Sequence, residues 1–221
     1  MPIHISGTGS FLPQNKVNNS SFSNRVFFDR DGNRYRNSND EIIEKFKTIT
    51  GIKERRYADK EHKTSDLATF AAQNAIKDAG IDKETLDYII VAHNFGDIEY
   101  GTNQYIALPS VATMVKHKLE IQNENCVAYD IIFGCPGWLE GVIQATAYIR
   151  SKMAKRCLVI GADTLSRTID DSDRDSMIFA DGAGATIIEE TSKSGGILSH
   201  KTITKAGKEA LYLFCEQSYD P

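Results

Sequence analysis

Long apolar segments are missing from this 221-residue sequence, because no run approaches the ~20 residues that a helix needs to cross a bilayer. The first residues, MPIHISG, contain no basic segment followed by an apolar stretch, so they do not resemble a signal peptide. We therefore expect a soluble, cytoplasmic protein without a membrane partner.

Cysteine is scarce. The sequence has four, at Cys126, Cys135, Cys157 and Cys215, and no pair has the CxxC spacing of many zinc and redox sites. Most of them fall in apolar stretches, which is how proteins of a reducing compartment use cysteine. The sequence therefore predicts neither a disulfide framework nor a bound metal.

An excess of charge of one sign is also missing. The chain has 26 basic and 30 acidic residues, for a net charge of −4. Nucleic-acid-binding proteins usually carry a basic face, and this sequence has no basic stripe. We therefore expect no nucleic-acid partner.

The glycine-rich segments do not match a phosphate-binding loop. A dinucleotide fingerprint that starts at Gly7 and Gly9 needs a third glycine at position 12, which is Leu12, and a following helix. The segment 181–185 (DGAGA) leads into a strand-like run, so its glycines are interpreted as allowing close backbone packing. We expect no nucleotide cofactor.

Apolar runs and periodic patterns alternate along the chain. Continuous apolar runs predict strands buried on both faces at 87–93, 126–131 and 156–162. Helical periodicity predicts helices at 64–80, 109–118 and 137–151, and one from Asp40 through Phe46 or beyond. Weaker signals predict strands at 3–9, 186–188 and 196–204, a short helix at 18–25, and irregular segments at 28–39, 94–107 and 163–175. This order is typical of a layered α/β fold with a mixed, mostly parallel central sheet that holds the three apolar strands side by side.

One stretch carries a candidate nucleophile. The run 126–131 leads into the corner Gly134-Cys135-Pro136-Gly137, and Pro136 suits the first position of the helix that follows. Cys135 is then placed at a helix N-terminus, where free N–H groups and the helix dipole favour the thiolate over the thiol. A lone cysteine is more often a small buried hydrophobe, but glycines around it leave room for a substrate.

The order of these segments resembles the N-terminal half of a thiolase-fold condensing enzyme of the β-ketoacyl-acyl-carrier-protein synthase III family. The resemblance rests on five stretches: Thr50–Arg56 (TGIKERR), Ala79–Ile81 with Ile89–Ala92, Asp130–Gly137, Val159–Asp163, and Phe179–Ala185. It implies a thiolase-like N-terminal domain over 1–199, with 200–221 as the start of a linker or C-terminal half that is truncated here.

The resemblance also implies a reaction in fatty-acid or polyketide-type synthesis. In that family the cysteine takes an acyl group from a coenzyme A thioester, and a decarboxylated malonyl unit on acyl carrier protein then attacks the thioester. Cys135 is accordingly expected to be the acyl acceptor, with its own N–H helping to form the oxyanion hole. Acyl thioesters and acyl carrier protein are the implied substrates and partners, no cofactor is implied, and a homodimer built across 105–131 is expected.

Two further residues are expected at the site by resemblance. Arg174 matches an arginine with which the family holds coenzyme A, while the tryptophan of that clamp is replaced by Lys45. Leu108 matches a residue that enters the partner subunit's acyl pocket. The family's decarboxylating histidine lies in an H-x-A-N-type motif that none of the five histidines here has: His4, His62, His93, His117 and His200. These five are interpreted as ordinary loop, strand-end or helix-surface residues.

Three functions stay open at this point. The chain is part of a condensing enzyme, a non-catalytic partner subunit of a ketosynthase, or a cysteine-dependent acyltransferase or thioesterase without decarboxylation. An intact corner around Cys135 favours the two catalytic alternatives over the partner subunit.

Overall fold

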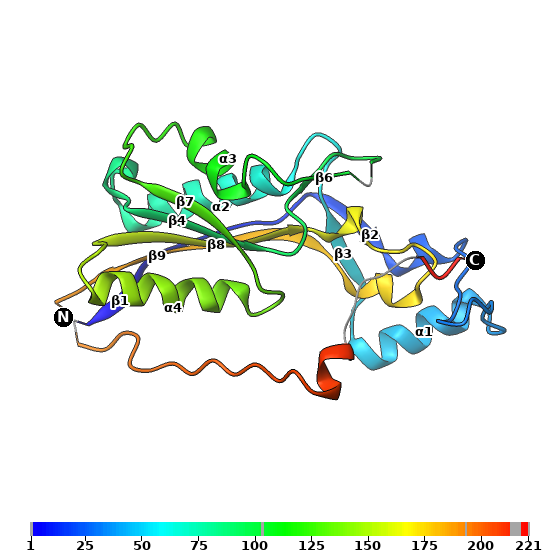
Figure 1. Ribbon diagram of the computed structural model, residues 1–221. Helices are drawn as coiled ribbons and strands as arrows, with labels where there is room; N and C mark the ends of the chain where they lie inside the picture. Colours follow the sequence, from blue (N-terminus) through cyan, green and yellow to red (C-terminus); the bar gives the residue numbers. More distant parts are fainter. Residues whose placement is uncertain (1, 103, 193, 213–217, 221) are drawn as a thin grey trace.

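A five-stranded sheet forms the centre of the computed structural model, which describes residues 2–102, 104–192, 194–212 and 218–220 (Figure 1). Its strands lie in the order β1 (Ile3–Phe11), β9 (Asp181–Glu190), β8 (Arg156–Thr164), β4 (Tyr88–His93) and β7 (Val127–Ile132). Four of these run in one direction, and β9 alone is antiparallel to its neighbours. The predicted mixed, mostly parallel sheet is confirmed.

The three apolar strands lie side by side, as predicted. β4 is in the middle, where Val91 pairs with Asp130 of β7 and with Ile160 of β8. Burial on both faces holds for β4 and β8 but is wrong for β7, whose Val127 and Ile132 are exposed. The reason is its position, because β7 pairs on one side only and is an edge strand of the sheet.

Helices cover the two faces of the sheet (Figure 1). One face carries α2 (Thr64–Ala79) and α3 (Val111–Lys118), and the other carries α4 (Gly137–Arg150). α2 ends at Gly80, which adopts the left-handed conformation that favours glycine. α3 begins two residues later than predicted, because Ser110 caps it by accepting a hydrogen bond from the Thr113 N–H.

Two glycines of β1 allow close packing against α2. A Cβ atom at Gly9 would lie 2.2 Å from the Ala71 carbonyl oxygen of α2, and one at Gly7 would lie 2.6 Å from that of Ala75. At Gly184, by contrast, a Cβ atom would meet nothing within 4 Å. The packing interpretation of 181–185 is therefore wrong at Gly184, where the sheet face is open.

A smaller unit is built around α1 (Asn39–Thr50). Its core brings together Phe22, Phe27, Ile42, Phe46 and Met177. The surrounding elements are β2 (Asn15–Asn18), η1 (Asn19–Phe22), β3 (Glu54–Tyr57) and η4 (Arg174–Ile178). Ser38 rather than Asp40 caps α1, since it is Ser38 that exchanges hydrogen bonds with Glu41.

The structure also corrects three of the predicted segments. The short helix at 18–25 is the 3₁₀ turn η1, β9 begins at Asp181 rather than 186, and the segment 94–107 contains β5 (Asp97–Ile98) and β6 (Tyr105–Ile106). The other 3₁₀ turns are η2 (Lys83–Thr85), η3 (Leu165–Arg167) and η5 (Lys208–Leu211).

The strand predicted at 196–204 is wrong. That segment is extended but belongs to no ladder of the described residues, and Leu198 and Ile203 are exposed. Alternating side chains make a strand only where a neighbour supplies hydrogen bonds. Within the described ranges, no helix has the length and apolar character needed to cross a membrane.

Candidate active site

Cys135 lies in the corner between β7 and α4. Gly134 has a φ of 67°, a left-handed conformation that turns the chain sharply at little steric cost. The Gly137 N–H donates a hydrogen bond to the Gly134 carbonyl oxygen at 3.0 Å, which closes the turn. Cys135 is exposed close to the start of the helix, as predicted, but α4 begins at Gly137, so Pro136 is the N-cap rather than the first helical residue.

Two glycines let the start of α4 lie directly on the sheet. A Cβ atom at Gly137 would come within 2.9 Å of the Ala92 Cβ of β4. One at Gly141 would come within 2.7 Å of the Val159 Cγ1 of β8. Because real Cβ atoms do not approach so closely, the helix holds this position only with glycine here. The corner is thereby fixed at the carboxyl edge of the parallel strands, where open α/β sheets bind ligands.

The cysteines differ in exposure and in pKa. Burial raises the pKa of the Cys126 thiol to about 11 and that of the Cys157 thiol to about 12. Both side chains are buried in the two cores of the sheet, whereas Cys135 is exposed. Cys215 lies outside the described residues. Of the cysteines that are described, Cys135 alone combines access with a helix start.

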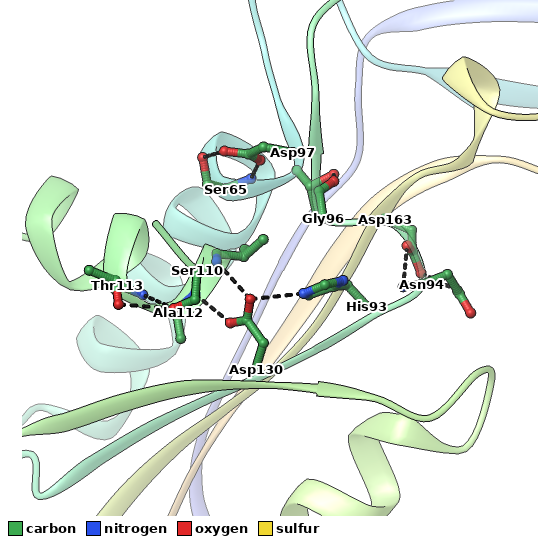
Figure 2. A network of polar contacts seen from close by, with 12 residues as sticks. Ser65, His93, Asn94, Gly96, Asp97, Ser110, Ala112, Thr113, Asp130 and Asp163 are labelled. Carbon is green, nitrogen blue, oxygen red and sulfur yellow. Dashed lines mark hydrogen bonds and ion pairs between the residues drawn. The ribbon is translucent and has the colours of Figure 1, made fainter. Parts of the chain in front are cut away.

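Between β4 and β7 lies a polar pair that the sequence analysis did not find. The Nε2 atom of His93, the last residue of β4, lies 2.9 Å from Oδ2 of Asp130 on β7 (Figure 2). Oδ2 also accepts the Val111 N–H, and Oδ1 accepts the Ala112 N–H, so the carboxylate caps the start of α3. The His93 side chain is 3% exposed, and its Nδ1 has no hydrogen-bond partner among the described residues.

A second polar contact joins β4 to β8. Asn94 donates its backbone N–H to one oxygen of Asp163 and its side-chain amide to the other (Figure 2). Burial raises the pKa of Asp163, and the two hydrogen bonds from Asn94 partly offset that rise. The carboxyl ends of β8, β4 and β7 are therefore linked side chain to side chain across the sheet edge.

The two residues expected by resemblance lie elsewhere. Arg174 is in η4, where its guanidinium stacks 4.7 Å from the ring centre of Tyr35 and its Nε lies 3.7 Å from Asp175. It thus belongs to the unit around α1 rather than to the corner. Leu108 is 84% exposed, between β6 and the cap of α3.

A signal for the missed pair was present in the sequence. His93 ends a buried strand and Asp130 lies in the next parallel strand, and such strand ends meet at one sheet edge. The pairing itself needs the strand order and register. Elsewhere in the described part of the chain, no group of three or more His, Cys, Asp or Glu side chains is arranged to hold a metal ion.

Comparison with known proteins gives one family. The family model for 3-oxoacyl-[acyl-carrier-protein] synthase III matches residues 129–206, which include the corner and β9. A β-ketoacyl-[acyl-carrier-protein] synthase III of Neisseria meningitidis is 42% identical over 196 residues, covering 88% of this chain and 54% of the relative. One from Staphylococcus haemolyticus is 37% identical over 215 residues, covering 97% of this chain and 61% of the relative.

Solved structures agree in fold. The 3-oxoacyl-[acyl-carrier-protein] synthase III of Aquifex aeolicus superimposes with a TM-score of 0.71 at 33% identity, covering 86% of this chain and 55% of that one. The corresponding synthase of Thermus thermophilus gives a TM-score of 0.71 at 30% identity, covering 87% and 53%. The predicted thiolase-like fold is confirmed. The chain belongs to the β-ketoacyl-[acyl-carrier-protein] synthase III family, and it spans about half the length of the curated relatives that it matches.

Proposed function

We propose that this chain carries the acyl-accepting part of a condensing enzyme, in which Cys135 takes an acyl group from a thioester substrate. The observation that carries the proposal is an exposed cysteine at a glycine-rich corner, next to the residue that caps a helix. The thiolate attacks the carbonyl carbon of the incoming thioester, the C–S bond of the donor breaks, and its thiol leaves. N–H groups at the helix start can stabilise the oxyanion that forms on the way.

The donors and partners follow from the family. We propose that the acyl donor is a coenzyme A or acyl-carrier-protein thioester, that Arg174 contributes to binding that donor, and that acyl carrier protein delivers the second substrate. The thiolate and hydrogen-bond donors supply this chemistry, so no cofactor is needed. Because Cys135 works as a free thiol, a reducing, cytoplasmic location suits the enzyme.

A direct test is acylation of the purified chain. Incubation with a series of saturated acyl-CoA thioesters is expected to raise the intact mass by one acyl group, and peptide mapping is expected to find it on Cys135. The variant Cys135→Ala serves as the control and is expected to stay unmodified. Absence of any acylated protein would instead favour the non-catalytic partner subunit.

We further propose that the chain accepts an acyl group but does not condense it. Decarboxylation of a malonyl thioester develops negative charge on the thioester oxygen, and each preorganised donor to it contributes about 2.7–4 kcal/mol. None of the five histidines has the sequence context of the family's donor. Carbon dioxide release from a malonyl thioester is expected to stay at background, and release at the rate of a full-length relative would contradict this.

A homodimer is proposed across the segment 105–131. Support comes from β7, an edge strand with exposed apolar Val127 and Ile132, and from exposed Leu108, which would enter the partner's acyl pocket. Light scattering at micromolar concentration is expected to give about twice the 24.6 kDa mass of one chain, and a clean monomer would contradict the proposal. We also propose residues 1–199 as the folded thiolase-like domain.

A further inference from the structure

The two ends of the reactive corner are held by two adjacent residues of β4. Ala92 faces α4 and contacts Gly137, the first residue of that helix. His93 faces the opposite side of the sheet and binds Asp130, five residues before Cys135 (Figure 2). The segment between Asp130 and Gly137, which contains the nucleophile, therefore spans two anchor points on one strand.

The contact at Asp130 is important for holding β7 in place, because β7 is an edge strand. As an edge strand, β7 pairs with β4 and with no other strand of the described residues. The carboxylate is instead held by two N–H groups of α3 and by the ring of His93. The ladder between β4 and β7 continues to Ile132, and His93 adds a side-chain contact from β4 to Asp130 within it. The strand that supports the exit of the corner therefore also holds the strand that enters it.

The hydrogen bond has a defined direction. An ionised carboxylate only accepts hydrogen bonds, so the Nε2 atom of His93 carries the hydrogen that faces Asp130. The opposite ring atom, Nδ1, is buried without a partner among the described residues. Only one of the two ring nitrogens therefore takes part in the contact.

We propose that His93 is a positioning residue for the reaction of Cys135. Its Nε2–H holds Asp130, and with it the end of β7, so that the thiolate stays aligned with the N-terminus of α4 and with an incoming thioester. This proposal rests on the proposed function for its catalytic consequence, but not for its effect on the thiol. Displacement of a nucleophile by about 1 Å reduces a reaction rate by up to ~100-fold.

The ring nitrogens give matched variants. In His93→Gln the side-chain amide reaches the place of Nε2 and can still donate to Asp130. In His93→Asn the amide reaches only the place of Nδ1, so the contact is lost. A control on the other side of β4 is Asn94→Ala, which removes the side-chain hydrogen bond to Asp163 on β8, keeps the backbone one, and leaves the corner's anchors in place.

Two rates on the 221-residue chain test the proposal. Iodoacetamide alkylation of Cys135, followed by mass spectrometry, is expected to be about threefold slower in His93→Asn, because alignment with the helix terminus is lost. Single-turnover acylation by the acyl-CoA that modifies the wild type fastest is expected to slow about tenfold at saturation, with half-saturation unchanged. Both rates are expected to be retained in His93→Gln and in Asn94→Ala.

The same measurements distinguish loss of folded protein from loss of alignment of Cys135. A variant that only unfolds gives a smaller acylated fraction with an unchanged rate constant. In the alkylation experiment it also labels the normally buried Cys126 and Cys157, and urea denaturation measures the unfolded fraction independently. Wild-type rates in His93→Asn, or equal slowing in His93→Gln or in Asn94→Ala, would overturn the proposal. If the wild type takes no acyl group, the proposed function fails while the alkylation rates still decide the role of His93.

Discussion

The two faces of the central sheet differ in how closely the helices pack against them. On the face of α2 and α3, the glycines of β1 let α2 approach to backbone contact, and the core there is closed. On the face of α4, a groove of about 390 Å³ stays open beside Trp138, and Leu139 is 52% exposed. The groove is lined by Thr8, Gly9, Trp138, Gly161, Gly184, Ala185 and Thr186. Both faces have a buried core, but the face of α4 also keeps this groove, and the exposed Cys135 precedes the helix on that face.

The largest difference is expected in thiol reactivity, between the exposed corner and the buried cores of the two faces. A thiol with a pKa of about 11, such as Cys126, carries roughly a hundredth of the thiolate of an ordinary cysteine near neutral pH. Burial adds to that difference and applies to Cys157 as well. Brief iodoacetamide treatment at pH 7.5 is therefore expected to label Cys135 at least 100-fold faster than either buried cysteine.

Mass spectrometry of the digested protein measures this contrast, with urea-unfolded protein as the control in which all sites react. Labelling of Cys126 is expected to rise only as the pH approaches about 11 or as the protein unfolds. Equal labelling of Cys126 and Cys135 in the folded protein would contradict the assignment of the nucleophile.

A smaller difference is expected between two leucines, one on each face. Leu67 of α2 is fully buried, whereas Leu139 of α4 is 52% exposed. Truncation of a buried leucine typically costs about 2–5 kcal/mol, so Leu67→Ala is expected to lower the free energy of unfolding by about 3 kcal/mol. Leu139→Ala is expected to lower it by less than about 1 kcal/mol. Urea denaturation compares the two, and similar losses would show that the α4 face is closed as well.

The smallest difference is expected between two glycines of neighbouring strands. A methyl group at Gly9 would collide with the backbone of α2, so Gly9→Ala is expected to cost about 2 kcal/mol. The same group at Gly184 meets open space, and Gly184→Ala is expected to change stability by no more than about 0.5 kcal/mol. Thermal or urea unfolding of both variants measures this difference in stability. A large loss of stability in Gly184→Ala would mean that the groove is covered in solution.

Local patterns were enough to predict most elements of this fold. The apolar runs around 89–92 and 156–162 became buried neighbouring strands, and Gly51 and Gly80 end helices in the conformation that their residue type favours. The corner around Cys135 was also predictable, because its glycines and proline act on the backbone over a few residues. Such features depend on residues adjacent in the chain.

What failed depended on partners distant in the chain. The alternating segment 196–204 found no strand to pair with, and the continuous run of β7 came to lie at an edge. Gly9 and Gly184 have the same residue type, yet one contacts a helix and the other lines a groove. Nothing within a few residues of either glycine distinguishes these two environments.

The sequence by itself determined the spacing of strands and helices, the sharp turn and the presence of a cysteine at its centre. Only the tertiary structure decided which side chains support that cysteine. His93 and Asp130 are 37 residues apart, and they meet because β4 and β7 are parallel neighbours whose ends lie at one edge of the sheet. A hydrogen bond of this kind depends on strand order, register and the face that each residue occupies, and these are set by packing of the whole domain.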